Sequence, residues 1–123
     1  KVTRKGLADS FSNAFSGISV LVTSEKNARI QKLILILVVI AGIVLRISPA
    51  HWITIALASG LVLASECFNT AVEYLSDTIT PEYDLKIKRA KDVTAAGVLI
   101  STIVAVITGL IIFIPAIIRF FDT

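Results

Sequence analysis

Charged residues are scarce in this chain and absent from long stretches of it. Only 17% of its 123 residues are Asp, Glu, Lys or Arg, whereas 55% are hydrophobic. Residues 93–118 carry no charge, and such a run is long enough to cross a bilayer core of about 30 Å. A soluble domain is usually less apolar, so a soluble helical bundle is the less favoured alternative.

The chain has one cysteine and no methionine. The single cysteine, Cys67, excludes an internal disulfide and a C-x-x-C site, and we interpret it as a small packing residue within a helix. Methionine is absent even from position 1, so we expect the start residue to have been removed. No signal peptide is predicted, because residues 1–32 are amphipathic rather than continuously hydrophobic.

Three apolar stretches predict three membrane-spanning helices, at about residues 30–47, 52–77 and 90–118, in one domain of residues 1–123. Before them, about residues 5–24 repeat apolar side chains at helical intervals, with polar side chains on the other faces. This pattern predicts an amphipathic helix that lies in the membrane interface, packs against its own protein, or does both. The expected fold class is therefore an all-α membrane protein.

Positive charge is concentrated in two places that flank the predicted spans: Lys1, Arg4, Lys5, Lys26, Arg29 and Lys32, then Lys86, Lys88, Arg89 and Lys91. By the positive-inside rule, the N-terminus and residues 78–89 face the cytoplasm, and the C-terminus faces outward. Because these clusters lie beside the membrane, we expect them to meet anionic lipid headgroups and not nucleic acid.

Acidic and amide side chains interrupt the second span within SECFNTAVEYLSD, residues 65–77. Four of them recur at helical spacing: Glu66, Asn69, Glu73 and Asp77. At about 100° per residue they form one stripe on a helix. Ionisable groups in a span cost on the order of 2.5–3.5 kcal/mol each, so the stripe needs a cation, a proton or a basic partner.

The predicted orientation places Asp77 at the cytoplasmic surface, Glu73 just inside it and Glu66 deeper in the lipid. A reaction between a soluble and a lipid substrate requires a site of this kind. The alternative is that Glu73 and Asp77 only cap the helix in the headgroup region, which leaves Glu66 unexplained.

Two further features fit a site that handles phosphate. Lys91 can neutralise phosphate charge and Asp92 can orient it or hold a metal-bound water, although such a pair is also common at a solvated helix start. Glu25 is either part of a surface ion pair, worth under about 1 kcal/mol, or a partner for Glu73 around Mg²⁺.

Taken together, these residues resemble a known family. The pattern E-x-x-N-x-x-x-E-x-x-x-D in residues 66–77, followed by R-A-K-D in residues 89–92, is similar to that of the small bacterial integral-membrane diacylglycerol kinases, which include the undecaprenol kinases. The resemblance extends over the amphipathic helix, T-S-E-K-N-A-R, the three spans and the E-Y-D loop. The family is unrelated to soluble kinases, and no G-x-x-x-x-G-K-[ST] phosphate loop occurs here.

The resemblance implies a kinase of the bacterial inner membrane, a homotrimer whose neighbouring subunits share active sites. It implies Mg²⁺-dependent transfer of the γ-phosphoryl group of ATP to the primary hydroxyl of a lipid alcohol, either diacylglycerol or undecaprenol. By position, Glu66 is expected to be the general base, with Asn69 supporting it and the lipid substrate, and Glu25 and Glu73 are expected to hold the metal. The residues expected at the nucleotide are Glu73, Asp77, Glu82, Tyr83, Asp84, Lys91, Asp92 and, where the family often carries tyrosine, Asn13.

One alternative comes from a different class, a small ion- or proton-translocating subunit that uses Glu66 and Glu73. It predicts carboxylates spread through the depth of the bilayer and polar residues facing them. The acids gather at one face instead, and the middle of the first and third spans offers only Ser101, Thr102 and Thr108. This asymmetry favours the kinase. A purely structural membrane protein leaves Glu66 unexplained.

Overall fold

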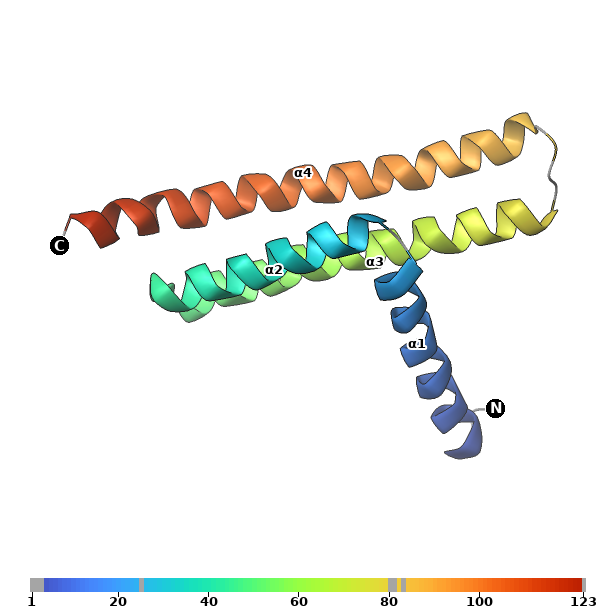
Figure 1. Ribbon diagram of the computed structural model, residues 1–123, viewed down its shortest axis with the longest axis horizontal. Helices are drawn as coiled ribbons and strands as arrows, with labels where there is room; N and C mark the ends of the chain where they lie inside the picture. The colour runs from blue at the N-terminus through green and yellow to red at the C-terminus, as the bar shows by residue number, and fades with distance from the viewer. Residues whose placement is uncertain (1–3, 25, 80–81, 83, 123) are drawn as a thin grey trace.

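The computed structural model describes residues 4–24, 26–79, 82 and 84–122, and these residues form four helices and no strand. The helices are α1 (Arg4–Ser24), α2 (Lys26–Val44), α3 (Pro49–Ile79) and α4 (Leu85–Phe121). In Figure 1, α3 and α4 run side by side, the shorter α2 lies along the first half of α3, and α1 projects away from them. The expected all-helical fold is confirmed.

The closest helix pair is α3 with α4, which run antiparallel over most of their length (Figure 1). They contain 31 and 37 residues, and both are long and apolar enough to cross a membrane. At 1.5 Å per residue α3 is about 46 Å long, more than the bilayer core of about 30 Å, so part of it must extend beyond the hydrocarbon. The apolar part of α2, Ile30–Val44, is shorter, so the first predicted span stays a prediction.

The hydrogen bonds at the end of α2 explain why this helix stops at Val44 and not near residue 47. Arg46 has a φ of 53°, in the left-handed region. The Arg46 N–H donates to the Ile43 carbonyl at 3.2 Å, and the Ile47 N–H donates to the Gly42 carbonyl at 3.1 Å. This pair of bonds is a Schellman motif, which satisfies the last carbonyls and turns the chain out of the helix.

The start of α3 follows directly from Ser48 and Pro49. The Ser48 side chain accepts a hydrogen bond from the His51 N–H at 3.3 Å, and Pro49 occupies the first helical position, where its missing N–H is harmless. One turn later, the Trp52 indole lies against Gly42 so closely that a Cβ there would be 2.6 Å from a ring carbon. Glycine at position 42 therefore allows α2 and α3 to approach.

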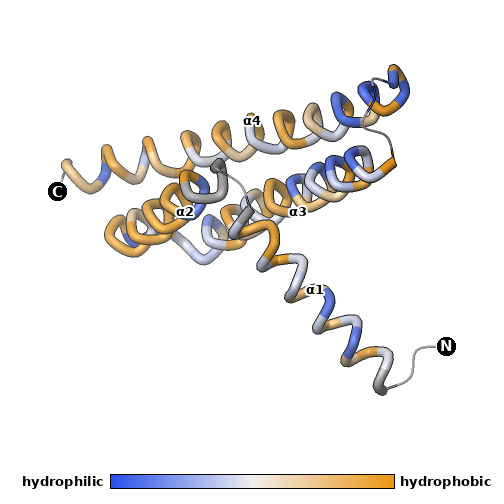
Figure 2. Tube along the Cα trace, turned by 45° about the vertical axis from the view of Figure 1, so that its right-hand side comes forward, coloured by the Kyte–Doolittle hydropathy of each residue, from blue (hydrophilic) through white to orange (hydrophobic). Residues whose placement is uncertain are grey.

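The buried core of one chain is small and lies near the α2–α3 turn. It consists of Ile47, Ile55, Ile112 and Ala116, with Val38, Leu45, Trp52 and Phe113 packed against it. Large apolar side chains elsewhere are exposed, among them Phe68 at 71% and Val93 at 70%. In Figure 2 hydrophobic residues make up most of α2, α3 and α4, whose exposed surface is therefore largely apolar, while hydrophilic ones gather at the end of α3 and the start of α4. This surface requires lipid or other chains to cover it.

Candidate functional site

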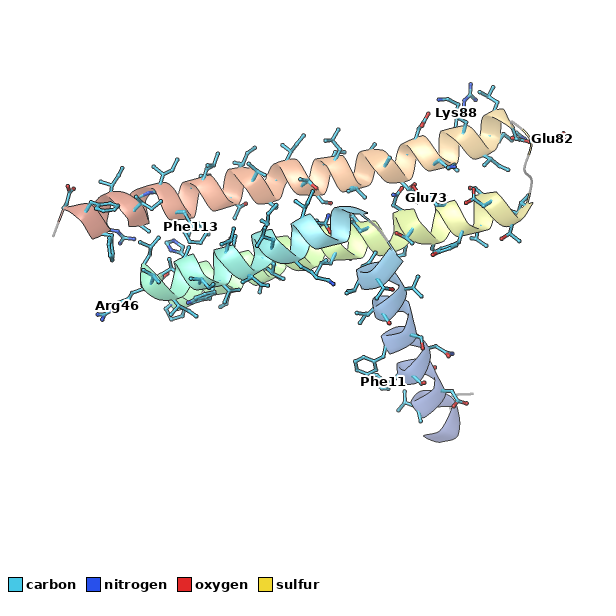
Figure 3. The ribbon with its side chains drawn as sticks, viewed as in Figure 1. Phe11, Arg46, Glu73, Glu82, Lys88 and Phe113 are labelled. Carbon is cyan, nitrogen blue, oxygen red and sulfur yellow. The ribbon has the colours of Figure 1, made fainter. Side chains whose placement is uncertain are left out.

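The predicted polar stripe lies on one continuous helix, α3. Its members become more buried from Asp77 back towards Glu66. Asp77 is exposed, Glu73 and Asn69 are half-buried, and Glu66 is only 8% exposed. Figure 3 shows Glu73 pointing from α3 towards α4. The stripe therefore leads from the polar end of the helix pair into its interior.

Glu66, on α3, is hydrogen-bonded to α2. The Gln31 side chain of α2 donates a hydrogen bond from Nε2 to Glu66 Oε1. A buried carboxylate is costly without hydrogen bonds, and this amide supplies one without adding a charge. Sequence analysis missed Gln31, because the residue that a single amide contacts depends on how α2 packs against α3.

Asn69 and Glu73 belong to a second set of hydrogen bonds, which reaches α4. Thr94 Oγ1 donates to Asn69 Oδ1 at 2.8 Å, and Asn69 Nδ2 donates to Glu73 Oε1 at 3.5 Å. Sequence analysis expected Asn69 to support Glu66, whereas here its partners are Glu73 and Thr94. Thr94 was also missed, because a threonine near a helix start carries no distinctive pattern.

A serine pair aligns α3 and α4 beside Glu66. Ser65 Oγ and Ser101 Oγ lie 2.8 Å apart, and each hydroxyl also lies within hydrogen-bond distance of a carbonyl of its own helix. Such interhelical bonds average about 0.6 kcal/mol in membrane proteins. The pair is one of the contacts between α3 and α4 in the alignment that places Thr94 opposite Asn69.

Asp84, expected at the nucleotide, is the N-cap of α4. Its Oδ1 accepts hydrogen bonds from the backbone N–H groups of Lys86 at 2.8 Å and Ile87 at 3.2 Å. An aspartate cap satisfies N–H groups that have no partner within the helix. This cap explains why α4 begins at Leu85, earlier than the predicted residue 90.

The other described residues expected at the nucleotide lie at the start of α4, in the connection between α3 and α4, and on α1. Lys91 is half-buried near the start of α4, and Asp92 forms an exposed ion pair with Lys88 at 2.7 Å. Glu82 is exposed in the connection between α3 and α4, which Figure 3 shows. Asn13 is exposed on α1, the helix that projects away. Glu25 and Tyr83 lie outside the described residues.

Glu73 is a suitable carboxylate for a divalent cation. Within the described ranges, no three His, Cys, Asp or Glu residues lie close enough together to form a metal site. Mg²⁺ does not need such a cluster, because it usually binds one or two carboxylates together with phosphate oxygens and water. Glu73 fits that requirement, since it is half-buried at the polar end and hydrogen-bonded to Asn69.

Comparison with known proteins identifies the family. The family model described as prokaryotic diacylglycerol kinase matches residues 12–113. The chain is 33% identical over 106 residues to the undecaprenol kinase of Bacillus subtilis, covering 86% of each chain. It is 35% identical over 107 residues to a diacylglycerol kinase of Synechocystis, covering 86% of this chain and 61% of that one. The chain therefore belongs to the prokaryotic diacylglycerol kinase family.

Family membership confirms the resemblance found in the sequence and makes the protein an enzyme, a lipid kinase. Together with the two long apolar helices, it also makes the protein a membrane protein. The alternative of an ion-translocating subunit is set aside by the same finding.

Proposed function

We propose that this protein transfers the γ-phosphoryl group of ATP to the primary hydroxyl of a membrane lipid alcohol, with Glu66 as the general base. The observation that carries the proposal is the position of Glu66. Its carboxylate is buried between two apolar helices, and the amide of Gln31 donates to it. A base for a lipid hydroxyl must be reached from the bilayer and still be able to accept a proton.

The length of α3 supports a position of Glu66 within the hydrocarbon layer and of Glu73 on its cytoplasmic side. Glu66 lies 17 positions after Pro49 and Glu73 lies 24 after it, which is about 26 Å and 36 Å along the helix axis. With Pro49 at the outer edge of a core about 30 Å thick, Glu66 lies just within its inner edge and Glu73 beyond it. A lipid hydroxyl and the phosphates of a cytoplasmic nucleotide would meet between these two carboxylates.

The proposed reaction is direct transfer. The proton of the lipid hydroxyl passes to Glu66 as the hydroxyl oxygen forms a bond to the γ-phosphorus, and the bond from that phosphorus to the bridging oxygen breaks, releasing ADP. Lys91 offsets negative charge on the phosphates. Phosphoryl transfer depends mainly on positioning and charge stabilisation, which these residues would provide. Mg²⁺, held by Glu73 and Glu25, would neutralise phosphate charge when bound.

The lipid is undecaprenol, diacylglycerol or both, since the relatives above carry both names. The test uses purified protein in detergent micelles with labelled ATP and Mg²⁺, and offers the two alcohols separately. Glu66→Gln is the matched control, because it keeps the shape of the side chain and removes the base. Label in either lipid, lost in the variant, supports the proposal. No label in either lipid, from protein shown to be helical, would overturn it.

We also propose that the protein is a homotrimer with active sites shared between neighbouring subunits. The exposed apolar side chains support this, because one chain leaves most of them uncovered. Light scattering corrected for detergent should give the mass of three 13.2 kDa chains. A monomer that retains full activity would contradict the proposal.

The proposed orientation places the N-terminus and residues 78–89 in the cytoplasm and the C-terminus outside the inner membrane. The basic residues near both cytoplasmic segments support it. A Glu82→Cys variant made together with Cys67→Ser should react with a membrane-impermeant thiol reagent only when the cytoplasmic side is accessible. Labelling from outside intact cells would contradict this orientation.

A further inference from the structure

We propose that Thr94 is a positioning residue of this kinase. Its hydroxyl fixes the orientation of the Asn69 amide, and through that amide it guides the Glu73 carboxylate towards the position in which it binds a divalent cation. The inference deepens the proposed function and depends on it, because Glu73 is the described carboxylate assigned to the metal there.

The direction of each hydrogen bond in this set follows from the chemistry of its end group. A carboxylate can only accept hydrogen bonds. The Asn69 amide must therefore turn its NH₂ group towards Glu73, which leaves its carbonyl oxygen facing α4. An oxygen there requires a donor, and Thr94 supplies one at 2.8 Å. Asn69 thus connects a donor on α4 to an acceptor on α3.

The two distances show which end of the amide is held more firmly. Thr94 Oγ1 lies 2.8 Å from Asn69 Oδ1, whereas Asn69 Nδ2 lies 3.5 Å from Glu73 Oε1, which is longer than an ordinary N–H···O bond of about 2.7–3.2 Å. The amide is thus anchored on α4 and only guides the carboxylate. Glu73 keeps its second oxygen and further lone pairs for a cation, since a carboxylate offers about four acceptor sites.

Thr94 differs in this respect from Thr102, another threonine of α4. A threonine within a helix commonly donates to a carbonyl one turn earlier. Thr102 does so, with its hydroxyl 2.8 Å from the Val98 carbonyl. The corresponding distances from Thr94 to the Lys91 and Ala90 carbonyls are longer, 3.0 and 3.2 Å, so its closest acceptor is on the neighbouring helix.

This difference provides a matched pair of variants. Thr94→Val and Thr102→Val make the same change of shape and polarity on the same helix, but only the first removes the donor to Asn69. Hydrogen-bond partners of metal-binding side chains typically change metal affinity 10- to 100-fold when they are lost. Because Thr94 acts one bond further away, we expect an effect of about three- to tenfold.

The first experiment measures phosphoryl transfer as a function of Mg²⁺ concentration. We expect Thr94→Val to raise the half-saturating Mg²⁺ concentration about three- to tenfold, with a smaller change in kcat. Thr94→Ser keeps the hydroxyl and should restore the wild-type value, and Thr102→Val should leave it unchanged. Circular dichroism establishes that each variant is folded. Equal effects of Thr94→Val and Thr102→Val would overturn the proposal.

The second experiment does not depend on turnover. Binding of Mn²⁺ in the presence of ADP is measured from the electron paramagnetic resonance signal of free Mn²⁺. Thr94→Val should weaken binding in the wild-type background and have no further effect in an Asn69→Ala background, since the two residues act in sequence. Additive losses would overturn the proposal. Weakened Mn²⁺ binding in a protein that phosphorylates neither lipid would retain the role of Thr94 while refuting the proposed reaction.

Discussion

Replacement of Gly42 by alanine tests the contact that places α2 against α3, and with it the position of Gln31 beside Glu66. A Cβ at position 42 would lie 2.6 and 2.8 Å from two carbons of the Trp52 indole and 3.0 Å from Ile47 Cδ1. The indole is rigid and partly buried in the core, so the helices themselves must shift. Enlarging a side chain at a packed position typically costs about 1–3 kcal/mol.

Alanine also favours the helix over glycine by about 1 kcal/mol, so a control must remove this contribution. Gly60→Ala is suitable, because nothing lies within 4 Å of a Cβ built on Gly60 in α3. Both variants gain helix propensity, so the difference between their free energies of unfolding isolates the contact with Trp52. We expect Gly42→Ala to be about 1–3 kcal/mol less stable than Gly60→Ala.

The assay is reversible unfolding in mixed micelles by increasing mole fraction of sodium dodecyl sulfate, followed by circular dichroism. The free energy of unfolding is compared between Gly42→Ala and Gly60→Ala. Turnover is measured in parallel, because a shifted α2 should also move Gln31 away from Glu66. Equal stability of the two variants would refute the packing of Trp52 on Gly42.

Three further substitutions test other parts of the structure. Gln31→Leu should lower kcat about tenfold or more, because a hydrogen bond to a charged group contributes roughly 1.5–3 kcal/mol, and an unchanged kcat would show that Gln31 does not position Glu66. Arg46→Gly should raise the free energy of unfolding by up to about 1 kcal/mol, since glycine adopts the left-handed φ at this position without strain. A loss of stability would contradict that reasoning. Asp92→Asn should change the free energy of unfolding by less than about 0.5 kcal/mol, because the ion pair of Asp92 with Lys88 is exposed. The same variant should raise the KM for ATP, and an unchanged KM would make Asp92 a surface residue only.

The helices and the polar stripe were predictable because both depend on spacing along one chain. A helix of 3.6 residues per turn places Glu66, Glu73 and Asp77 on one face wherever the helix lies. The start of α3 also has a local signal, since Ser48 and Pro49 are typical of a helix N-terminus, although the predicted span began later, at about residue 52.

The partners of the stripe were not predictable, because they depend on how the helices rotate and slide against one another. Gln31 reaches Glu66 and Thr94 reaches Asn69 only when the helices adopt one particular alignment. Contacts such as the pair of Ser65 and Ser101 set that alignment, and a single serine has no periodic pattern that would reveal it.

The start of α4 lies before the predicted span of residues 90–118 and has a local signal of its own. Asp84 followed by a helical segment is an N-cap signal, but the resemblance assigned this residue to the nucleotide. One aspartate can serve both purposes. The end of α2 was missed because a Schellman motif usually contains glycine, and here Arg46 takes that place.

The most direct test of the central claim is the effect of Glu66→Gln on ATP binding and on lipid phosphorylation, measured on the same preparation. Asp9→Asn, at an exposed position on α1, is the control for losing one carboxylate. We expect Glu66→Gln to bind ATP with nearly wild-type affinity and to lose about 10²- to 10⁴-fold in turnover, the usual contribution of a general base. Turnover within a few-fold of the wild type would show that Glu66 is not the base.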